Sequence, residues 1–378
     1  MDRSVEIELI DDLLGLQAQT PPFLDEQWHR ESLERYYSPD IFRREQAQIS
    51  ARLPQIIAHG SALPEPNAYL TTEVAGRPVL LTRNEDGAVQ AFFNVCRHRS
   101  AKMVREHEGC EHRFRCPYHG WTWNNIGDLI GVPHEKTGFP GLDRSEFGLV
   151  PLPCQEYAGW IWLSLDSDSG IEVEHHLGDI RHDLLAMDAG SHKIFATETR
   201  EIKANWNILV EGGIEAYHFR VAHKNNIADL FPDNLSSCHS YGPHLRSILP
   251  RTTLASLADQ PREQWRLRDH ANILYSFFPG AQFLVQSDHF VWIRGIPLGP
   301  DHTRLELSTL VPGSENTLAK QEYWRKNHAF TVLTLDEDFQ LAEDIQSGLA
   351  SGANSHLNFG RFEGALDTFN RIVDQAIA

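Results

Sequence analysis

The sequence predicts an α+β protein in which a small all-β domain precedes a larger domain built from an antiparallel sheet and helices. Between residues 92 and 163, short β-rich pieces alternate with Gly and Pro turns. A polar, turn-forming run over 166–170 ends this region, and helical periodicity follows it. Residues 270–311 return to strand-like alternation before helical patterns over 314–348 and 361–377. This change of periodicity indicates two domains, for which 378 residues are ample.

Three segments follow from these observations. Residues 1–50 are expected to be a helical segment that packs on the larger domain, residues 51–165 to be the all-β domain, and residues 166–378 to be the larger domain. We find no internal repeat and no low-complexity stretch that would suggest a different division.

The N-terminal segment carries helical patterns. Leu9, Leu13 and Leu16 lie at helical spacing, which predicts an amphipathic helix over 5–18. The stretches 26–36 and 40–50 carry mixed helical patterns with many charges, and we expect helices there too.

The all-β domain begins with a predicted hairpin. The runs 78–82 and 89–93 are rich in β-branched, aliphatic and aromatic residues, and Asp86-Gly87 between them is a good hairpin signal. Residues 121–123 and 160–163 are β-rich as well, which extends the strand prediction toward the end of this domain.

The larger domain alternates helices and strands. Helices are expected over 178–188 and 205–219, although Gly212-Gly213 interrupts the second. Strands are expected at 283–285, 290–293 and 305–311. The last helical pattern places four apolar residues on one face: Phe362, Leu366, Phe369 and Val373.

Composition argues against several classes of protein. A formal net charge of −18 argues against nucleic-acid binding, which needs a basic surface. No run of about 18 apolar residues predicts a membrane span, and the first residues do not resemble a secretory signal. Three of the five cysteines, Cys110, Cys154 and Cys238, do not suggest a disulfide framework, so we expect a reduced, cytoplasmic protein.

Two short metal-binding clamps stand out in the all-β region. One residue separates Cys96 from His98, and two residues separate Cys116 from His119. Each clamp offers one thiolate and one imidazole, as in the Rieske arrangement, where two Cys bind one iron of a [2Fe-2S] cluster and two His bind the other. A structural zinc site could use the same ligand types, but its usual spacing groups Cys with Cys and His with His. The alternation therefore favours a Rieske cluster.

A second set of possible ligands lies further along the chain. His218 and His223 are five residues apart, which on a regular helix turns them ~140° away from each other. They can share an ion only if the helix ends or bulges between them. The acidic run 336–344 could add a carboxylate, although by pattern alone it is a solvated helix face. Spacing alone leaves a metal site and ordinary histidines both open.

Four motifs make the chain resemble the catalytic α subunit of a Rieske non-haem iron oxygenase, of the aromatic ring-hydroxylating oxygenase family. They are Cys96-x-His98, Cys116-x2-His119-Gly120-Trp121, Glu215-x-Tyr217-His218-x4-His223 and Glu337-Asp338-x4-Glu343. The resemblance extends over nearly the whole chain. It implies that the all-β domain is a Rieske [2Fe-2S] domain and that the larger domain is a helix-grip (START-like) catalytic domain with a long C-terminal helix.

The resemblance also implies the roles of individual residues. His218, His223 and Asp338 would bind one mononuclear Fe(II), with open positions for O2 and substrate. Glu215 would be catalytic by connecting this iron to a cluster histidine of the neighbouring subunit. Because Glu215 and His218 are three residues apart, we expect them to share a helical face.

One departure from the family pattern concerns two glycines. Family members commonly read Glu-Asn where this chain has Glu211-Gly212, and Gly213 follows. Each glycine weakens a helix by roughly 1 kcal/mol relative to alanine. Either the segment is kinked or mobile, or the glycines permit close packing of the backbone.

The implied function is that of a terminal oxygenase component that uses O2 to hydroxylate an aromatic or other small organic substrate. No G-x-G-x-x-G fingerprint follows a predicted strand, so electrons would come from a separate NAD(P)H-dependent flavin reductase, with or without a ferredoxin. The resemblance, in which Glu215 works across a subunit boundary, also implies a ring of subunits, and we expect a homotrimer.

The substrate cavity is expected to be apolar, because such pockets are lined mainly by apolar and aromatic side chains. The candidates for its wall are Leu209, Phe219, Phe278, Phe283, Val285, Phe290 and Trp292.

Other functions remain open at this point. Within the family, oxidative O- or N-demethylation is an alternative, including attack on a quaternary amine held in an aromatic cage. Outside the family, the clamps alone fit a Rieske electron carrier, and the C-terminal half alone fits an apolar-ligand binding module. Neither of these would use both sets of ligands.

Overall fold

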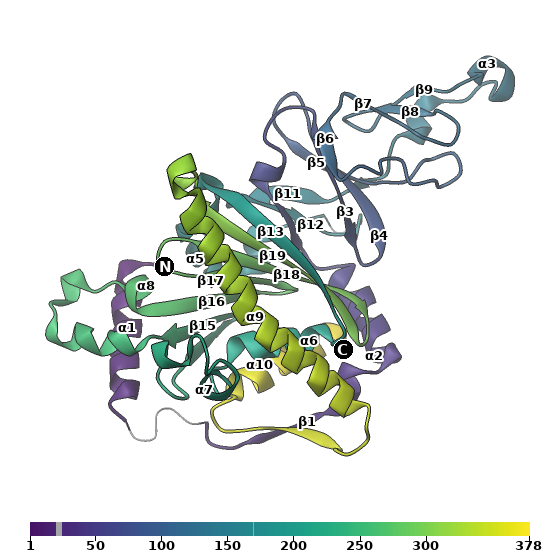
Figure 1. The fold of residues 1–378 in the computed structure, drawn as a ribbon. Helices are drawn as coiled ribbons and strands as arrows, with labels where there is room; N and C mark the ends of the chain where they lie inside the picture. Colours follow the sequence, from purple (N-terminus) through teal and green to yellow (C-terminus); the bar gives the residue numbers. More distant parts are fainter. Residues whose placement is uncertain (20–24, 169) are drawn as a thin grey trace. The chain divides into compact units, whose positions relative to one another are not determined.

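A computed structural model, which describes residues 1–19, 25–168 and 170–378, divides the chain into two compact units (Figure 1). The smaller unit is Ser50–His176, and the larger one joins Met1–Ile49 to Leu177–Ala378. Residues 166–176, which the sequence placed in the larger domain, thus group with the smaller unit.

The smaller unit is built from antiparallel strands in three sheets. Their strand orders are β10-β5-β4-β3-β6, β11-β12-β2 and β7-β8-β9. The strands are β2 Gln55–His59, β3 Ala68–Val74, β4 Arg77–Arg83, β5 Val89–Phe93, β6 Glu108–Cys110, β7 Arg113–Arg115, β8 Thr122–Asn124, β9 Leu129–Gly131, β10 Pro151–Leu152, β11 Cys154–Tyr157 and β12 Trp160–Leu163. The short helices are α3 Glu135–Gly138 and α4 Val173–Leu177. The predicted hairpin is present as the β4–β5 pair.

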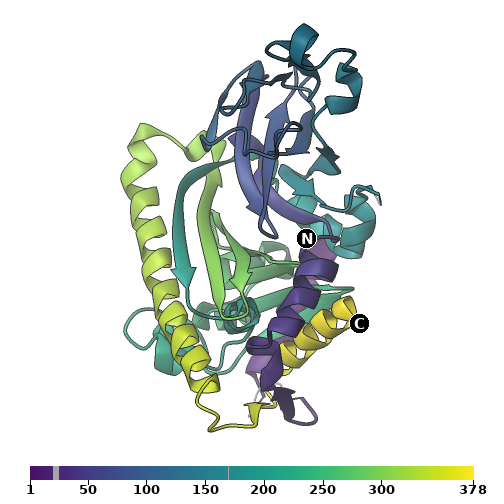
Figure 2. The ribbon, with the colours of Figure 1, turned by 90° about the vertical axis from the view of Figure 1, so that its right-hand side faces the viewer.

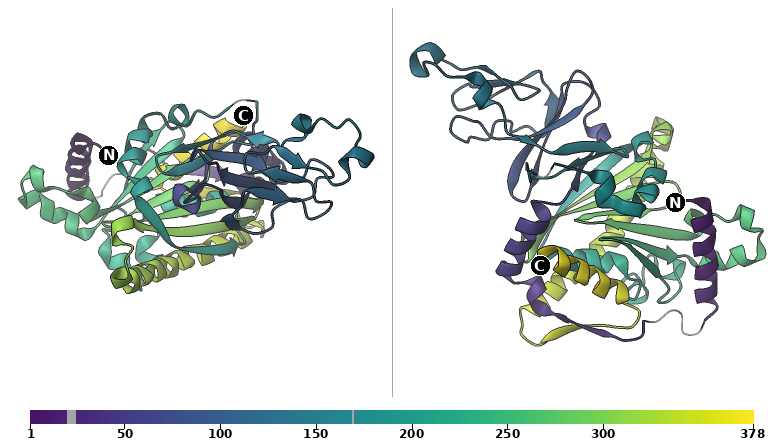
Figure 3. Two further views of the ribbon diagram at one scale, coloured as in Figure 1. Left: turned by 90° about the horizontal axis from the view of Figure 1, so that it is seen from above. Right: turned by 180° about the vertical axis from the view of Figure 1, so that it is seen from behind.

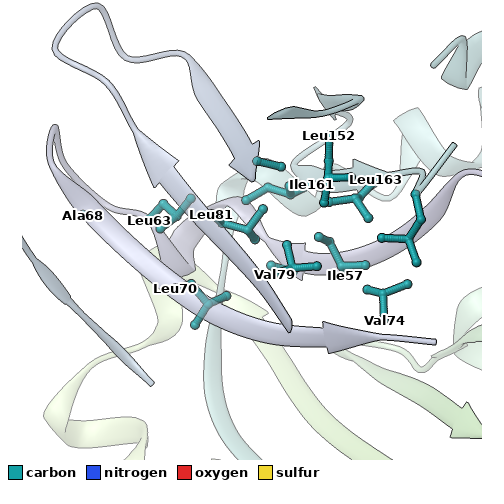
Figure 4. Close-up of a cluster of buried hydrophobic side chains, with 13 residues drawn as sticks. Ile57, Leu63, Ala68, Leu70, Val74, Val79, Leu81, Leu152, Ile161 and Leu163 are labelled. Carbon is teal, nitrogen blue, oxygen red and sulfur yellow. The ribbon is translucent and has the colours of Figure 1, made fainter. Parts of the chain in front are cut away.

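Strand β4 separates two cores because its side chains alternate between its faces. Val79 and Leu81 enter an aliphatic core with Ile161 of β12 (Figure 4). Leu80, between them, enters a second core that also contains the buried thiol of Cys96. One face of the strand therefore stabilises the sheets, and the other supports the first candidate site.

The larger unit is organised around a seven-stranded antiparallel sheet with the order β13-β19-β18-β17-β16-β15-β14. Its strands are β13 His192–Ile202, β14 Ser237–Tyr241, β15 His244–Pro250, β16 Ala271–Phe277, β17 Ala281–Val285, β18 Phe290–Gly299 and β19 His302–Pro312. The strands predicted at 283–285, 290–293 and 305–311 all lie in this sheet.

Helices surround this sheet. They are α1 Arg3–Gln17, α2 Pro39–Glu45, α5 Arg181–Ala186, α6 Trp206–Ile214, α7 Phe219–Ala222, α8 Leu267–His270, α9 Gln321–Leu349 and α10 Gly364–Ile377. The long helix α9 runs obliquely across the sheet and contacts β13, β19 and α6 (Figures 1 and 2). The rear view shows α10, in yellow, which packs on α6 and α2 (Figure 3). None of the described helices combines the length and apolar character needed to cross a bilayer.

Two helical predictions near the termini of the chain were wrong. The stretch 26–36 forms strand β1 His29–Ser32 and a 3-10 turn, because β1 pairs with β20 His356–Phe359 from the opposite end of the chain. Phe362 precedes α10 and packs instead against the ring of Tyr217, at a centroid distance of 4.1 Å. Both outcomes depend on long-range contacts that local periodicity does not contain.

Helix α6 is fixed at several points. The Asn205 side chain caps it by accepting a hydrogen bond from the Asn207 N–H at 2.8 Å. The buried Glu211 carboxylate accepts a hydrogen bond from the Tyr36 hydroxyl at 2.8 Å, and burial raises the pKa of Glu211 to about 8. The indole N–H of Trp206 donates to buried Glu45 at 3.0 Å. These contacts hold in place the helix that leads into the second candidate site.

Candidate functional site

The two Cys-His clamps fold into loops with the same hydrogen-bond pattern. In each loop the cysteine N–H donates to the carbonyl five residues later at 2.8 Å, and the cysteine carbonyl accepts from the N–H four residues later at 3.0 Å. That fourth position is Ser100 in the first loop and Gly120 in the second, with φ of 58° and 73°. Two matching turns thus present one Cys and one His each.

The four clamp ligands gather in one place. The thiols of Cys96 and Cys116 are buried in the same core, and burial together with the nearby Cys116 thiol raises the pKa of Cys96. The rings of His98 and His119 have their centroids 4.7 Å apart. Nδ1 of His98 is buried and has no hydrogen-bond partner among the described residues, an arrangement that is rare unless another group such as a metal satisfies it. The donor set fits a [2Fe-2S] cluster with two Cys and two His ligands.

The surroundings of the two clamp histidines differ. The ring of His98 is stacked on Trp121, with a centroid distance of 5.0 Å, and Phe139 meets it edge-on at 5.6 Å. The side chain of His119 is exposed and contacts the ring of Tyr118 at 3.7 Å. An apolar shell around a metal site limits solvent access and tunes its potential. Aromatic rings therefore cover the histidine of the first clamp, whereas the histidine of the second clamp is exposed.

The second ligand set converges because the helix breaks twice. Helix α6 ends at Ile214, and α7 is a single turn over Phe219–Ala222. His218 immediately precedes this turn, and His223 ends it with φ −99° and ψ 24°. Helix α7 ends at Ala222, between the two histidines. The condition under which the two histidines can share an ion is therefore met.

Asp338 of α9 completes the set. Its Oδ1 lies 3.4 Å from Nε2 of His218 and 3.0 Å from Nε2 of His223. One ligand atom from each of the three residues falls within 4.8 Å of the others. Adjacent ligands ~2.1 Å from one ion are ~3 Å apart, so one ion fits among them. Two His and one carboxylate that leave positions open are typical of non-haem Fe(II) oxygenases.

Each of the two ligand histidines, His218 and His223, contacts a second carboxylate through its Nδ1 atom. The Glu215 carboxylate contacts Nδ1 of His218, and Oε2 of Glu337 accepts a hydrogen bond from Nδ1 of His223 at 2.7 Å and from the Asn226 amide at 2.8 Å. These contacts leave Nε2 of each ring to face Asp338. Sequence reasoning missed Glu337, although its place beside the predicted ligand Asp338 was the available signal.

The predicted reason for the Glu215–His218 contact was wrong. Glu215 is not on a helix but in extended conformation, with φ −125° and ψ 164°. Its carboxylate also accepts the backbone N–H groups of Tyr217 and His218, so it closes the turn that follows α6. A local turn, rather than a helical face, brings the two residues together.

The electrostatics of this set favour a cation. Burial would lower the pKa of His218, but its contacts with Asp338 and Glu215 outweigh burial and raise the pKa to about 10. Burial would raise the pKa of Asp338, but the two histidines hold it below its usual range. Carboxylates that stabilise a protonated imidazole so strongly also attract a divalent ion, and binding of that ion displaces the imidazole proton.

A cavity of about 130 Å³ opens beside these three ligands. It is lined from α6, α7, the sheet and α9; the α9 residues Thr334, Leu335, Asp338, Phe339 and Ala342 lie on one face of that helix. Among the described residues of the lining, the ionisable side chains are those of His218, His223 and Asp338. The neutral polar side chains are Asn272, Gln282, Thr303 and Thr334.

Only part of the predicted wall was right. Leu209 and Phe219 line the cavity. The other five, Phe278, Phe283, Val285, Phe290 and Trp292, are buried outside the lining. On β17 the lining residues are Gln282 and Leu284, so the prediction chose the wrong face of the strand. Phe283 instead packs in an aromatic cluster with Phe277 at 5.4 Å.

Replacing Glu337 by glutamine is expected to weaken metal binding at the His218–His223–Asp338 site roughly 10- to 100-fold, because a neutral amide raises the basicity of His223 less than a carboxylate does. Anaerobic titration of metal-free protein with Fe(II) measures the affinity. Asp344→Asn, which removes an exposed charge from the same helix, is the matched control. Equal affinity of the Glu337 variant and the control would show that Glu337 does not support the site.

Comparison with known families finds two matching models. A model described as "Ring hydroxylating alpha subunit (catalytic domain)" matches residues 189–378, and one described as "Rieske [2Fe-2S] domain" matches residues 54–154. The two matches correspond to the regions that hold the two ligand sets.

Individual relatives fall into more than one substrate class. The chain is 30% identical over 217 residues to chlorobenzene dioxygenase subunit alpha of Cupriavidus sp. (strain PS12), covering 56% of this chain and 48% of the relative. It is 32% identical over 193 residues to the carnitine monooxygenase oxygenase subunit of Acinetobacter pittii (strain PHEA-2), covering 50% and 51%. The matches thus span about half the length of these curated relatives.

The fold is shared along nearly the whole chain with a solved structure. The quaternary ammonium Rieske monooxygenase CntA in complex with L-carnitine superposes with a TM-score of 0.79 at 24% identity, covering 94% of this chain and 97% of that one. At this identity the similarity concerns the architecture alone.

Proposed function

Because the chain belongs to the family of Rieske ring-hydroxylating oxygenase alpha subunits, we propose that it is the terminal component of an oxygenase that hydroxylates a small, neutral organic molecule with O2. The observation that carries this proposal is the convergence of His218, His223 and Asp338 on the wall of an apolar cavity. An electron carrier or a simple binding module has no use for such a triad beside a cavity.

When bound, a [2Fe-2S] cluster held by the two clamps would store an electron, and an Fe(II) ion held by His218, His223 and Asp338 would supply the oxygen-activating chemistry. The protein supplies the geometry and the environment. Glu215 and Glu337 orient the two histidines, and Asp338 adds the negative charge that holds a cation. The apolar lining excludes water from the space where the substrate would lie.

The charge of the lining favours a neutral substrate. A carboxylate taken from water into this cavity would meet no Lys or Arg among the described lining residues, and an unpaired buried charge costs several kcal/mol. Asn272 and Gln282 can each hydrogen-bond one polar group of a neutral molecule. We therefore favour an arene or a related neutral compound over a zwitterion.

Oxidation of a quaternary amine is the second candidate. Four aromatic side chains, Trp206, Phe219, Phe231 and Phe339, line the cavity, and aromatic faces attract quaternary ammonium groups. The similarity to carnitine monooxygenase points the same way. This candidate lacks a partner for the carboxylate that carnitine carries.

Product analysis separates the two candidates. Iron-loaded, chemically reduced protein is exposed to 18O2 with chlorobenzene or with L-carnitine, and products are identified by mass spectrometry. We expect labelled oxygen in a chlorobenzene product and none from carnitine. Oxidation of carnitine alone would replace the favoured function by the second one, and no labelled product from either would contradict the neutral-arene proposal.

The partners follow from the same proposal. Electrons would come from a separate NAD(P)H-dependent flavin reductase, directly or through a ferredoxin. Glu215 would connect the Fe(II) site of one subunit to the cluster of the next, and a head-to-tail ring such as a homotrimer provides this contact to every subunit. The exposure of His119 and Tyr118 supports this arrangement, because it leaves one edge of the cluster site accessible to another chain.

A further inference from the structure

The two adjacent glycines of α6 have different structural explanations. An ideal Cβ on Gly213 would lie 3.1 Å from Nε2 of Gln282 and 3.2 Å from Cδ2 of Leu274. Both distances are shorter than ordinary van der Waals contacts, so a side chain at Gly213 would push against the sheet. Close packing of helix on strand therefore explains Gly213.

Packing does not explain Gly212. An ideal Cβ at this position has no heavy atom within 4 Å outside the backbone of its own helix and its chain neighbours. Its backbone is helical and does not have the positive φ that favours glycine. A glycine in a helix interior costs roughly 1 kcal/mol relative to alanine. Glycine thus lowers the stability of the helix at a position where a larger side chain would fit.

The surroundings of Gly212 indicate what its free space is for. Gly212 lines the cavity that the iron ligands His218, His223 and Asp338 also line. It lies on α6, which hydrogen bonds to Tyr36 and Glu45 fix in place, so the helix is held against moving inward to fill the space. Because glycine has no side chain, the atoms of a bound molecule can approach the helix backbone more closely at Gly212 than they could at any other residue type.

We propose that Gly212 is a specificity-determining position: the missing side chain lets the cavity admit neutral substrates of two fused rings, where a larger residue would restrict it to single rings. This inference rests on the proposed function and specifies the size of its substrate. Size exclusion is an efficient basis for selectivity, because one methylene in a close-fitting apolar pocket changes discrimination roughly 10- to 200-fold.

Binding of a one-ring and a two-ring probe tests the proposal. Benzene and indole are titrated by calorimetry into the wild-type protein and into the Gly212→Ala and Gly212→Leu variants, all with both metal sites loaded and without reductant. We expect indole to lose affinity roughly tenfold in the alanine variant and more in the leucine variant, while benzene changes little in the alanine variant. Gly348→Ala is the matched control, because Gly348 is an exposed glycine of α9 that also has no neighbour within 4 Å of an ideal Cβ.

Thermal unfolding of the same variants shows that they remain folded, and both alanine variants should gain stability from better helix propensity. Equal changes in affinity for both probes, no change for either, or no binding of indole to the wild-type protein would overturn the proposal. Because the readout is binding, its failure differs from that of the proposed function: a protein that binds the probes with the expected size dependence but forms no oxygenated product contradicts only the latter.

Discussion

Replacing Asp338 by alanine empties the mononuclear site and abolishes oxygenation, while the visible spectrum of the [2Fe-2S] cluster stays unchanged. The carboxylate is the only negatively charged member of the triad and lies 3.0 Å from His223 and 3.4 Å from His218. Without it, two neutral imidazoles hold a divalent ion weakly. Iron analysis, the visible spectrum and product formation measured on one sample check this expectation.

Asp344, an exposed carboxylate on the same helix, provides the control for the Asp338 variant. Asp344→Ala removes the same chemical group from the exposed face of α9 and should leave iron content and turnover unchanged. If the Asp338 variant kept its iron and its turnover, Asp338 would not be a ligand, and the assignment of the triad would fail.

Replacing Glu215 by glutamine is expected to leave the [2Fe-2S] cluster in place, and protein reloaded with excess Fe(II) so that both metal sites are filled should form product roughly 100-fold or more slowly, the scale of an essential proton-handling group. The amide keeps the size of the side chain and can still accept from Nδ1 of His218, but it carries no charge and takes up no proton. Single turnover of pre-reduced protein with O2 and substrate measures the loss.

The Glu337→Gln variant is the matched comparison for Glu215→Gln, since both carboxylates contact Nδ1 of a ligand histidine. Once loaded with iron, the Glu337 variant should turn over at close to the wild-type rate, because no role between subunits is assigned to Glu337. Normal turnover of the Glu215 variant, or equal losses in the two variants, would reduce Glu215 to a residue that only orients its histidine.

Several features of the fold and of the site could be predicted from the sequence because residues close together in the chain determine them. The clamps at Cys96–His98 and Cys116–His119 are short enough that spacing specifies the loop, and the structure shows two matching turns there. The hairpin at β4 and β5 and the long helix α9 follow from periodicity and turn residues in the same way.

Other features depend on contacts that are distant in the sequence. The face of β17 that meets the cavity is decided by α6 and α9 above it, so alternation could not show that Leu284 rather than Phe283 lies there. The end of α6 at Ile214 depends on how Glu215 closes the next turn, which helix propensity does not capture. The hydrogen bond between Glu337 and His223 joins α9 to the end of α7, and the strands β14 to β19 lie between these two helices in the sequence.

The most direct test of two iron sites in one chain is a metal and sulfide count on protein prepared and loaded without oxygen. The expected result is about three iron atoms and about two acid-labile sulfides per chain, with the third iron absent from the Asp338→Ala variant and both sulfides retained. Two irons per chain in both proteins, or zinc in place of iron, would contradict the assignment of an electron-storing cluster and a separate oxygen-activating iron.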